Sequence, residues 1–561
     1  MKQLKYYTSI LLLVFFLNIP QMDAQKVTVT AVPANDFLNT IGVNTSIGSR
    51  GENPTETLNA IGYTGFRWIR SGVPDGTGTR INHLRWLHED YGIRFSYLLG
   101  TNNNIQGVID GARELIDKVS PDAFLAFEGS NEPNNWGIFY NGEYGGGKYN
   151  DAHPGPHSWK PLAKYHRDFY AAVKADPIVG TAGYNYPVWS ASDIGACWEN
   201  VGMQFLTIPE NAVGVDPEFP AGTTFADFAC VHNYFSGISA YSNNQTWRSA
   251  ALTGNNGIKS NFGDTWNKHY SGYTDEQLAD LPRVTTETGT TITGGGTGVT
   301  EQYQGLTYLS CYLAQFKQGF SYTSMYLLRD RVDEGGNQTF GFYVGDSKYT
   351  PRLAAHYMHN MTTVLNDRTS IQNPGTLTYG FTGTVKDYLH DLLLQKNDGT
   401  LMLVVWGEKF ARYAQPDDVT LEFDQTFDKI NVYNPAQYDA DDPEIGTRPI
   451  AVYTHVNAIP LALLNHPFIL EINPKETGIN AVNVEKTSFS SVYSEEHTLY
   501  LKSTTDLKKV ELFDLAGKKV FQPENPKERY AGFKLGTLAK GSYIVRVTSV
   551  QNQVETHKII I

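Results

Sequence analysis

Two glutamates follow apolar runs, and their side chains could share acid–base chemistry. Glu132 comes shortly after the run 123–128, inside an Asn-Glu-Pro triplet, and Glu287 closes the run 283–287. Two carboxyl groups that flank a glycosidic bond can divide its cleavage between them. One must carry a proton for the leaving oxygen, and the other must be ionised to attack or stabilise the anomeric carbon. An exposed loop acid and a helix-capping or ion-paired acid are the alternatives for these two positions.

Eight short apolar segments are predicted to be the β-strands that position these acids. They are 39–44, 66–70, 93–99, 123–128, 178–183, 225–232, 283–287 and 321–328. Segments with apolar residues at three- and four-residue spacings separate most of them and are predicted to be helices, at 81–92, 105–119, 159–175, 300–318 and 351–365. This alternation predicts a (β/α)8 TIM barrel over residues 36–366, with a doubly wound open sheet as the alternative.

The barrel prediction also places the two acids. Catalytic groups of such barrels lie at the carboxyl ends of the strands. Glu132 follows the fourth strand and Glu287 ends the seventh, on opposing parts of the ring. We therefore expect their side chains to face each other across the mouth, whereas Glu128 is expected to be buried in the barrel and paired with an arginine.

The remaining chain predicts two β-rich domains and a cleaved leader. Strand-like segments at 385–396, 401–407, 418–423, 429–434 and 467–473 predict a β-sandwich over 367–474, with strand 26–33 as a candidate addition. A third β-rich unit is predicted over 479–561. The first 24 residues combine two lysines, an apolar run and a small residue before Gln25, which is typical of a secretory signal peptide. That apolar run is too short to span a bilayer permanently, so we expect an exported protein without a transmembrane segment.

Composition narrows the classes of function. The chain has 561 residues and a formal net charge of −13, which argues against a nucleic-acid partner because phosphate backbones attract Lys and Arg. Aromatic residues make up 13% of the chain, which fits either a large core or stacking on sugar rings. Three cysteines, Cys197, Cys230 and Cys311, are too few for a disulfide framework and lack metal-type spacing.

The Asn131-Glu132-Pro133 triplet resembles the strand-four signature of clan A retaining glycoside hydrolases. The resemblance implies that Glu132 is the general acid/base and Glu287 the nucleophile, with no metal or organic cofactor. It also implies that Asn131 donates or accepts a hydrogen bond at the sugar 2-hydroxyl. Within the clan, the early VNTSIG segment, the GSNEPN signature and the trailing sandwich look most like glycoside hydrolase family 39, and families 5 and 30 are the alternatives.

The same resemblance assigns supporting residues at other strand ends. It implies that Arg70 lies near the nucleophile and keeps it ionised, with Arg67 as the rival in that strand. His232 and Tyr234 lie on one face of the sixth strand and would line the cleavage subsite, with Tyr234 bonded to the nucleophile. Trp136 and Tyr326 are further candidates for substrate binding by stacking on sugar. Repulsion between the two carboxylates is expected to raise the pKa of Glu132 and keep it protonated.

The C-terminal unit resembles the sorting domain of the Bacteroidetes type IX secretion system. The matching features are VELFDLAGKKV at 510–520, the run at 538–547 and the basic-apolar tail 557–561. The resemblance implies passage through the periplasm and the outer membrane, then release or surface attachment, with the type IX machinery as partner. An ordinary carbohydrate-binding or immunoglobulin-like sandwich is the alternative.

These inferences together predict a secreted glycosidase that acts on a plant or algal polysaccharide or its oligosaccharides. A carbohydrate-binding protein without activity on the same scaffold and a transglycosidase are the competing functions. A serine esterase is disfavoured because the chain has no Gly-x-Ser-x-Gly elbow.

Overall fold

The computed structural model describes most of the chain. The described residues are 25–71, 79–133, 135–146, 158–181, 184–192, 201–234, 276–277, 280–293, 299–336, 338–384, 389–408, 415–473, 490–495, 498–514, 518–523, 530–536, 538–539, 541–551 and 554–561. The expected signal peptide, Cys197 and most of the segment 240–280 lie outside them. The chain divides into two compact units, Met1–Pro474 and Lys475–Ile561, which are taken in turn below.

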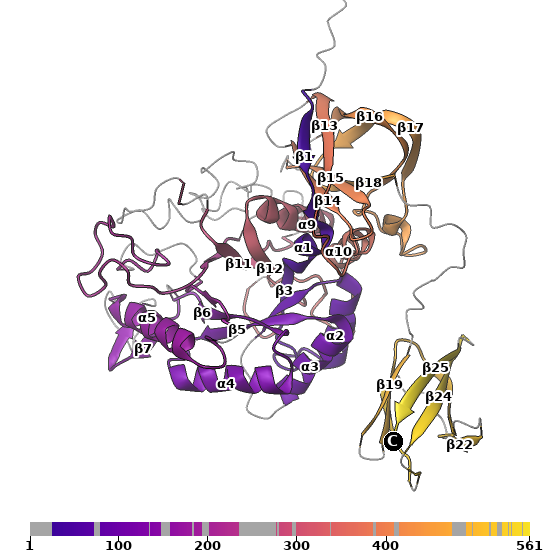
Figure 1. Ribbon diagram of the computed structural model, residues 1–561, viewed down its shortest axis with the longest axis horizontal. Helices are drawn as coiled ribbons and strands as arrows, with labels where there is room; N and C mark the ends of the chain where they lie inside the picture. The colour runs from indigo at the N-terminus through magenta and orange to yellow at the C-terminus, as the bar shows by residue number, and fades with distance from the viewer. Residues whose placement is uncertain are drawn as a thin grey trace, which may run out of the picture. The chain divides into compact units, whose positions relative to one another are not determined.

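Eight parallel strands form the sheet that carries the site (Figure 1). They are β3 (Ile41–Asn44), β4 (Trp68–Ser71), β5 (Arg94–Gly100), β6 (Phe124–Ser130), β9 (Val188–Trp189), β10 (Ala229–His232), β11 (Arg283–Thr288) and β12 (Phe320–Met325). Hydrogen-bonded neighbours run β10-β11-β12-β3-β4-β5-β6-β9, and a parallel bridge between Trp189 and Phe228 brings the two ends together. Neighbouring strands follow chain order round a closed ring, which confirms the predicted barrel and excludes the open doubly wound sheet.

The predicted fifth strand is wrong. Residues 178–181 form a turn, and the fifth barrel strand is Val188–Trp189. The Asp176 carboxylate accepts hydrogen bonds from the backbone N–H groups of Ile178 and Val179 at 2.9 and 3.0 Å. This side-chain capping of the turn overrides the β-propensity of the two apolar residues.

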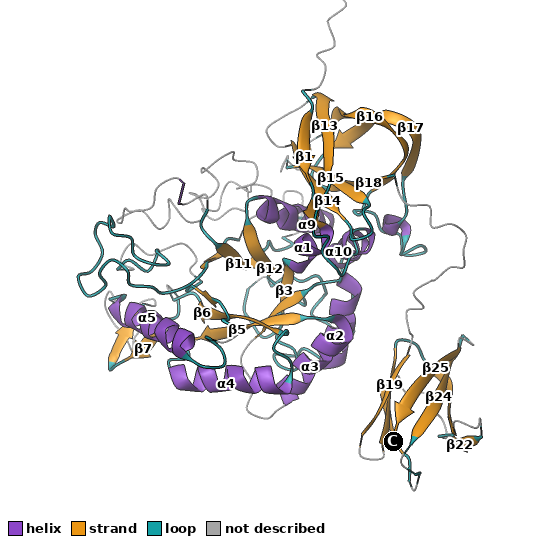
Figure 2. Ribbon diagram, viewed as in Figure 1, coloured by secondary structure: helices purple, strands orange, loops and turns teal. Residues whose placement is uncertain are grey.

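Helices cover the outside of the barrel (Figure 2). They are α1 (Ala34–Asn39), α2 (Pro54–Thr64), α3 (Thr79–Tyr91), α4 (Ile105–Lys118), α5 (Lys160–Ala175), α9 (Glu301–Lys317) and α10 (Leu353–Val364). In α4 the side chain of Asn104 accepts from the N–H of Gly107, and the buried residues Val108, Ala112 and Leu115 recur at three- and four-residue spacings. A capped start and an apolar stripe together make this segment a helix that packs on the sheet.

The barrel interior is filled by large side chains. Trp68 and Trp189 meet edge to face with ring centroids 5.7 Å apart, and Cys230 and Val284 belong to the same buried cluster. At Gly42 a Cβ atom would lie 2.2 Å from the Trp68 ring, so β3 needs glycine there. The interior is therefore a packed core, and the space for a ligand lies above it, at the strand ends.

A second eight-stranded sheet follows the barrel in the chain. Its strands are β1 (Val27–Thr30), β2 (Val32–Pro33), β13 (Thr376–Gly383), β14 (Leu389–Gln395), β15 (Leu401–Gly407), β16 (Asp417–Tyr433), β17 (Ala451–Leu463) and β18 (Pro467–Ile472). The N-terminal strands join it, β1 against β13 and β2 against β14. Side chains of β15 alternate between two clusters, because Met402 and Val404 belong to the barrel core and Leu403 and Val405 to the core of the sheet.

The strand pattern of this region was predicted incompletely. Residues 418–423 and 429–434 were expected as two strands, but most of both belongs to β16, which stays extended across an irregularity between Glu422 and Phe427. The segment between the two predicted strands contains neither glycine nor proline, so no residue there forces the chain to turn. Strands β13 and β17 were not predicted.

The described residues of the C-terminal unit form β-strands and the loops between them. Its strands are β19 (Ser490–Glu495), β20 (Thr498–Ser503), β21 (Leu507–Asp514), β22 (Lys519–Phe521), β23 (Tyr530–Lys534), β24 (Ser542–Ser549) and β25 (Val554–Ile560). They form a three-stranded sheet, β19-β20-β23, and a four-stranded sheet, β22-β21-β24-β25. Leu499, Leu512 and Val545 lie in one buried cluster, so this unit has its own core.

The two remaining strands, β7 (Ile138–Tyr140) and β8 (Glu143–Gly145), form a hairpin shortly after Glu132. A 3₁₀ turn, η3 (Ile445–Thr447), lies between β16 and β17. In the part of the chain that is described, no helix combines the length and apolar character needed to cross a membrane.

Candidate active site

A pocket of about 840 Å³ opens at the carboxyl ends of the barrel strands. Residues predicted for the site line much of it: Arg70, Asn131, Glu132, Trp136, Tyr234, Glu287 and Tyr326. Seven of the eight predicted site residues therefore gather round one cavity, although they come from five different strands or the loops that follow them. The described residues that line the pocket do not include His232, which lies behind Glu132.

Glu132 and Glu287 face each other in this pocket. One carboxylate oxygen of each lies within 4.8 Å of the other and of a ring nitrogen of His232. Glu287 belongs to β11, and its side chain is 10% exposed. Glu132 follows β6 with a φ of +41°, and its carbonyl accepts from the N–H groups of Asn135 and Trp136 at 2.7 and 2.8 Å. The turn after β6 therefore holds Glu132 in an uncommon left-handed conformation with its carboxyl in the pocket.

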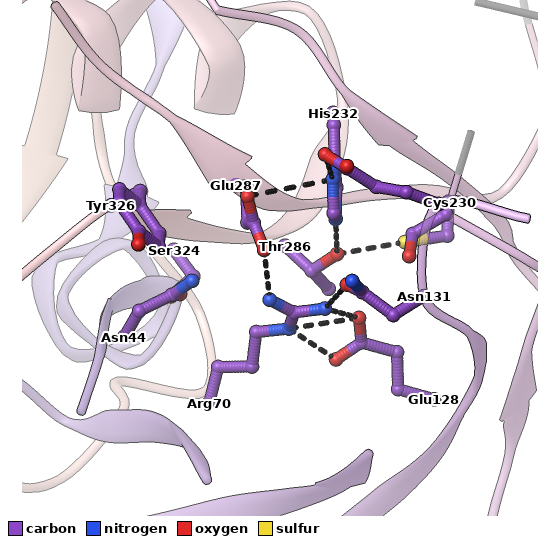
Figure 3. Close-up of polar contacts among 12 residues, drawn as sticks. Asn44, Arg70, Glu128, Asn131, Cys230, His232, Thr286, Glu287, Ser324 and Tyr326 are labelled. Atoms are coloured by element: carbon purple, nitrogen blue, oxygen red, sulfur yellow. Dashed lines mark hydrogen bonds and ion pairs between the residues drawn. The ribbon is translucent and has the colours of Figure 1, made fainter. Parts of the chain in front are cut away.

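Arg70, at the end of β4, ties the buried acids together (Figure 3). Its Nε donates to both oxygens of Glu128 at 2.8 Å, and its Nη2 donates to Glu128 Oε1 at 2.6 Å. Its Nη1 donates to Glu287 Oε1. Burial lowers the pKa of Arg70, but the charges of Glu128 and Glu287 outweigh burial and raise it. The guanidinium therefore stays charged and stabilises the carboxylate form of Glu287.

The same guanidinium sets the orientation of Asn131. Arg70 Nη2 donates to Asn131 Oδ1 at 2.6 Å. Since the amide oxygen is occupied in this way, the group that Asn131 offers to a ligand is its NH2. The sequence left open whether this amide donates or accepts, and the geometry favours donation. The rival arginine, Arg67, donates instead to the backbone carbonyl of Asp367 at 2.7 Å.

Tyr234 and His232 contact the two acids from the sixth strand and the residues after it. The Tyr234 hydroxyl donates to Glu287 Oε2 at 2.5 Å. Burial, and then the charge of Glu287, raise the pKa of Tyr234 well above its ordinary value, so the phenol keeps its proton. His232 Nδ1 lies 2.9 Å from Glu132 Oε1 and 3.5 Å from Glu287 Oε2. His232 thus contacts both carboxylates without lining the cavity.

The pKa of Glu132 is lower than the sequence predicts. Burial raises the pKa of Glu132, but the hydrogen bond and charge of His232, then Asn135 and Arg70, outweigh burial, and the pKa lies below its ordinary value. Asn135 Nδ2 donates to Glu132 Oε2 at 2.9 Å. Repulsion from Glu287 therefore does not raise the pKa of Glu132 above its ordinary value, because these donors stabilise its carboxylate.

Aromatic side chains line one part of the pocket. Tyr326 meets Tyr234 with ring centroids 6.1 Å apart and Phe340 at 5.5 Å, and its hydroxyl donates to Glu334 Oε2 at 3.2 Å. Trp136 is 60% exposed at the pocket. An exposed indole beside a polar cavity has a free face for a sugar ring, whereas Tyr326 is held by its neighbours.

Several residues of the site were not predicted. Asn44 ends β3, and with its amide oxygen toward Arg70 Nη1, 3.3 Å away, its nitrogen donates to the carbonyl of Thr286 at 2.9 Å. Its position at a strand end could have indicated this role. The hydroxyl of Thr286 lies 3.1 Å from His232 Nε2. In this part of the sequence, only the next residue, Glu287, was predicted to belong to the site. Contacts between distant parts of the barrel reveal Thr286 and Phe340 as members of the site. Asn135, by contrast, lies three residues after Glu132 and bonds it locally.

Glu132, His232 and Glu287 are also the group of described residues whose atoms could hold a metal ion. Arg70 Nη1 and the Tyr234 hydroxyl already bond the two oxygens of Glu287, and His232 and Asn135 bond those of Glu132. A buried guanidinium beside the group repels a second cation. The arrangement suits a hydrogen-bonded pair of acids better than a metal centre.

Comparisons with known proteins add distant likenesses. A family model described as a domain of unknown function (DUF8694) matches residues 477–561. A search of the curated proteins finds no match. Among solved structures, a family 39 glycoside hydrolase from the gut symbiont Bacteroides cellulosilyticus WH2 is 12% identical, with 79% of this chain and 82% of that chain covered and a TM-score of 0.46.

Two further solved structures are similar over much of their length. A GH30 endoxylanase from Clostridium papyrosolvens C71 is 9% identical, with 79% of this chain and 99% of that chain covered and a TM-score of 0.44. CelM2, a bifunctional glucanase-xylanase from a metagenome library, is 9% identical, with 80% and 97% covered and a TM-score of 0.47. At these identities and TM-scores the likenesses say nothing about the chemistry of this chain.

Proposed function

We propose that the protein is a retaining glycoside hydrolase in which Glu287 is the nucleophile and Glu132 the general acid/base. The observation that carries the proposal is the approach of their carboxylate oxygens to within 4.8 Å at one pocket. Retaining enzymes hold the two carboxyl groups about 5–5.5 Å apart, whereas inverting enzymes need about 6.5–9.5 Å to admit a water molecule. The short separation therefore favours double displacement.

In the first step the sugar is transferred to the enzyme. Arg70 and Tyr234 hold one oxygen each of Glu287, which orients its carboxylate for attack on the anomeric carbon. The NH2 group of Asn131 donates to the sugar 2-hydroxyl, a contact that strengthens in the transition state. Glu132 Oε1 delivers a proton to the leaving oxygen, so the glycosidic bond breaks as the bond to Glu287 forms.

In the second step water releases the sugar. Esterification removes the negative charge of Glu287, and Glu132, now a carboxylate, takes a proton from the attacking water. The new C–O bond forms on the face from which the leaving group departed, so the product keeps its anomeric configuration. A carbohydrate-binding protein without activity needs neither acid at this separation, which is why we favour the enzyme; a transglycosidase would use the same groups with a sugar in place of water.

We expect the loss of activity in Glu132→Ala to be larger for substrates whose leaving group needs a proton. With a poor leaving group, such as an alkyl glycoside, kcat/KM should fall about 10²–10⁴-fold, because general acid catalysis is lost. With a dinitrophenyl glycoside, which leaves without a proton, the release of the phenol in the first turnover should change little. Stopped-flow measurement of both substrates checks this, and equal losses on both would contradict the role of Glu132.

The substrate belongs to the same proposal. The resemblance to family 39 and the expected export together favour a plant or algal polysaccharide, or oligosaccharides derived from one. A panel of such polysaccharides, with product masses measured and the anomer followed by NMR during hydrolysis, identifies the sugar. An initial product of inverted configuration would overturn the retaining mechanism.

We propose that the C-terminal unit is a type IX sorting domain and that the leader directs the chain to the periplasm first. The supporting observations are its VELFDLAGKKV and tail motifs and the fact that it has a core of its own. A separate core allows a signal domain to act, and to be removed, without disturbing the unit that carries the site.

Deletion of residues 475–561 should stop export without loss of activity. In a host with a working type IX system, the shortened protein should accumulate in the periplasm, because it keeps its leader and lacks the sorting unit. The purified protein should keep kcat/KM within about twofold, since independent domains fold alone. Fractionation with immunoblotting checks the location, and fusion of residues 475–561 to a periplasmic carrier is the control; secretion of the deletion variant would contradict the proposal.

A further inference from the structure

A chain of hydrogen bonds continues behind the general acid/base. His232 Nδ1 lies 2.9 Å from Glu132 Oε1, and His232 Nε2 lies 3.1 Å from Thr286 Oγ1. Thr286 Oγ1 in turn lies 3.1 Å from Cys230 Sγ. Figure 3 shows Thr286 between the imidazole and the thiol. His232, Thr286 and Cys230 are all fully buried, so no bulk water competes for these bonds.

The charges around these hydrogen bonds favour one proton held by Glu132 or His232. The carboxylates of Glu132 and Glu287 repel each other, because their oxygens approach to within 4.8 Å at a site that is largely closed to water. Arg70 supplies one positive charge, but Glu128 already takes three of its hydrogen bonds. Asn135 is neutral and Tyr234 keeps its proton, so neither balances the second carboxylate. A proton on Nδ1 of His232, which contacts both acids, balances this charge.

The direction of the chain then decides which ring nitrogen can release that proton. A threonine hydroxyl accepts and donates at once, and a thiol is a weak acceptor. If Nε2–H donates to Thr286 and Thr286 donates to Cys230 Sγ, the imidazole holds its Nε2 proton permanently. The proton on Nδ1 can then pass to Glu132 Oε1 and leave a neutral ring. The reverse direction would place a lone pair on Nε2 and tie the only ring proton to Nδ1.

We propose that Thr286 and Cys230 are positioning residues that keep a proton on Nε2 of His232, so that the catalytic proton is stored between His232 Nδ1 and Glu132. The proposal rests on the proposed glycosidase function. The stored proton moves from Nδ1 to Glu132 Oε1 and on to the leaving oxygen. The proton that Glu132 later takes from water returns to Nδ1, so each turnover restores the site. Burial raises the pKa of the Cys230 thiol well above its ordinary value, which keeps it neutral as the last acceptor.

Removal of the Thr286 hydroxyl tests the relay. In Thr286→Val, Nε2 loses its acceptor, and a ring proton there would be buried without a partner. We expect kcat/KM for an alkyl glycoside to fall about tenfold or more, the basic limb of its pH profile to move about one unit toward lower pH, and the first-turnover rate on a dinitrophenyl glycoside to change less than about threefold. Thr286→Ser, which keeps the hydroxyl, should restore both the rate and the limb, and Cys230→Ser should resemble the natural protein more closely than Cys230→Ala.

Two results would overturn the inference. One is a basic limb and a leaving-group dependence that Thr286→Val leaves unchanged; the other is an equal loss on both substrates, which indicates only a structural role. A measurement that does not depend on activity distinguishes failure of the relay from failure of the proposed function. In ¹⁵N-histidine NMR of the ligand-free protein, with His232 assigned through His232→Gln, Nε2 should be protonated at every pH from 5 to 8 in the natural protein and in Thr286→Ser, and should lose this proton in Thr286→Val. An unprotonated Nε2 in the natural protein also contradicts the relay.

Discussion

Glu287→Ala is expected to lose hydrolysis almost completely, with kcat lower by about 10⁴-fold or more, because no other group can form the glycosyl-enzyme. The other acids described at the pocket offer no substitute. Glu132 is assigned to the opposite side of the bond to be cleaved, and Glu128 is fully buried beneath Arg70. Glu334 is held by Arg331 and the Tyr326 hydroxyl. Turnover of an aryl glycoside, followed by release of the phenol, measures the loss.

Azide separates a missing nucleophile from a misfolded variant. A small anion can occupy the space left by the Glu287 side chain beside Arg70 Nη1 and attack the anomeric carbon. Added azide should restore phenol release by about tenfold or more and yield a glycosyl azide of inverted configuration, because only one displacement occurs. Glu143→Ala, which removes an exposed glutamate of β8, is the matched control and should be neither slow nor responsive to azide. A Glu287→Ala variant that keeps its full activity would refute the assignment.

The barrel could be predicted because seven of its eight strands carry a strong local signal. Seven of the eight predicted segments overlap a barrel strand, since most of these strands are rich in apolar, aromatic or β-branched residues. The fifth was misplaced because Val188–Trp189 is too short to stand out, while Ile178 and Val179 form an apolar pair whose backbone is bound by the Asp176 side chain. That capping bond joins residues only two or three positions apart, but a hydrophobic pattern does not register it.

The residues of the site also fall into those that the sequence predicts and those that only the fold reveals. Glu132 could be found because an acid follows a predicted strand. Arg70 and Tyr234 could be found because the resemblance to clan A glycoside hydrolases implies them at the ends of other strands. Thr286 could not be found, because a threonine inside a strand is ordinary until the fold places it between His232 and Cys230. The lowered pKa of Glu132 was also beyond the sequence, since it depends on His232 and Asn135, which contact its carboxylate from different parts of the barrel.

Arg70→Met is expected to damage both stability and activity more than any other change to a residue that does not touch the reacting atoms. Loss of the guanidinium leaves Glu128, which is 0% exposed, as an uncompensated buried acid. Breaking a buried ion pair by removing one partner costs about 3–5 kcal/mol, so the urea midpoint of the barrel unit should fall clearly at pH 7. Hydrolysis should fall about 10³-fold or more, because Glu287 and Asn131 lose their orientation together.

A double variant distinguishes the two effects of Arg70. Arg70→Met combined with Glu128→Met replaces the buried pair by apolar side chains of similar volume, which in other proteins is often neutral for stability. We expect the urea midpoint to return to within the equivalent of about 1–2 kcal/mol of the natural protein, while activity stays as low as in the single variant. Arg70→Lys, which keeps the charge but cannot bond Glu128, Asn131 and Glu287 at once, should be intermediate in stability and nearly as inactive. If the double variant recovered activity with its stability, Arg70 would only fill and neutralise the core, and the orientation of Glu287 would have to come from Tyr234 alone.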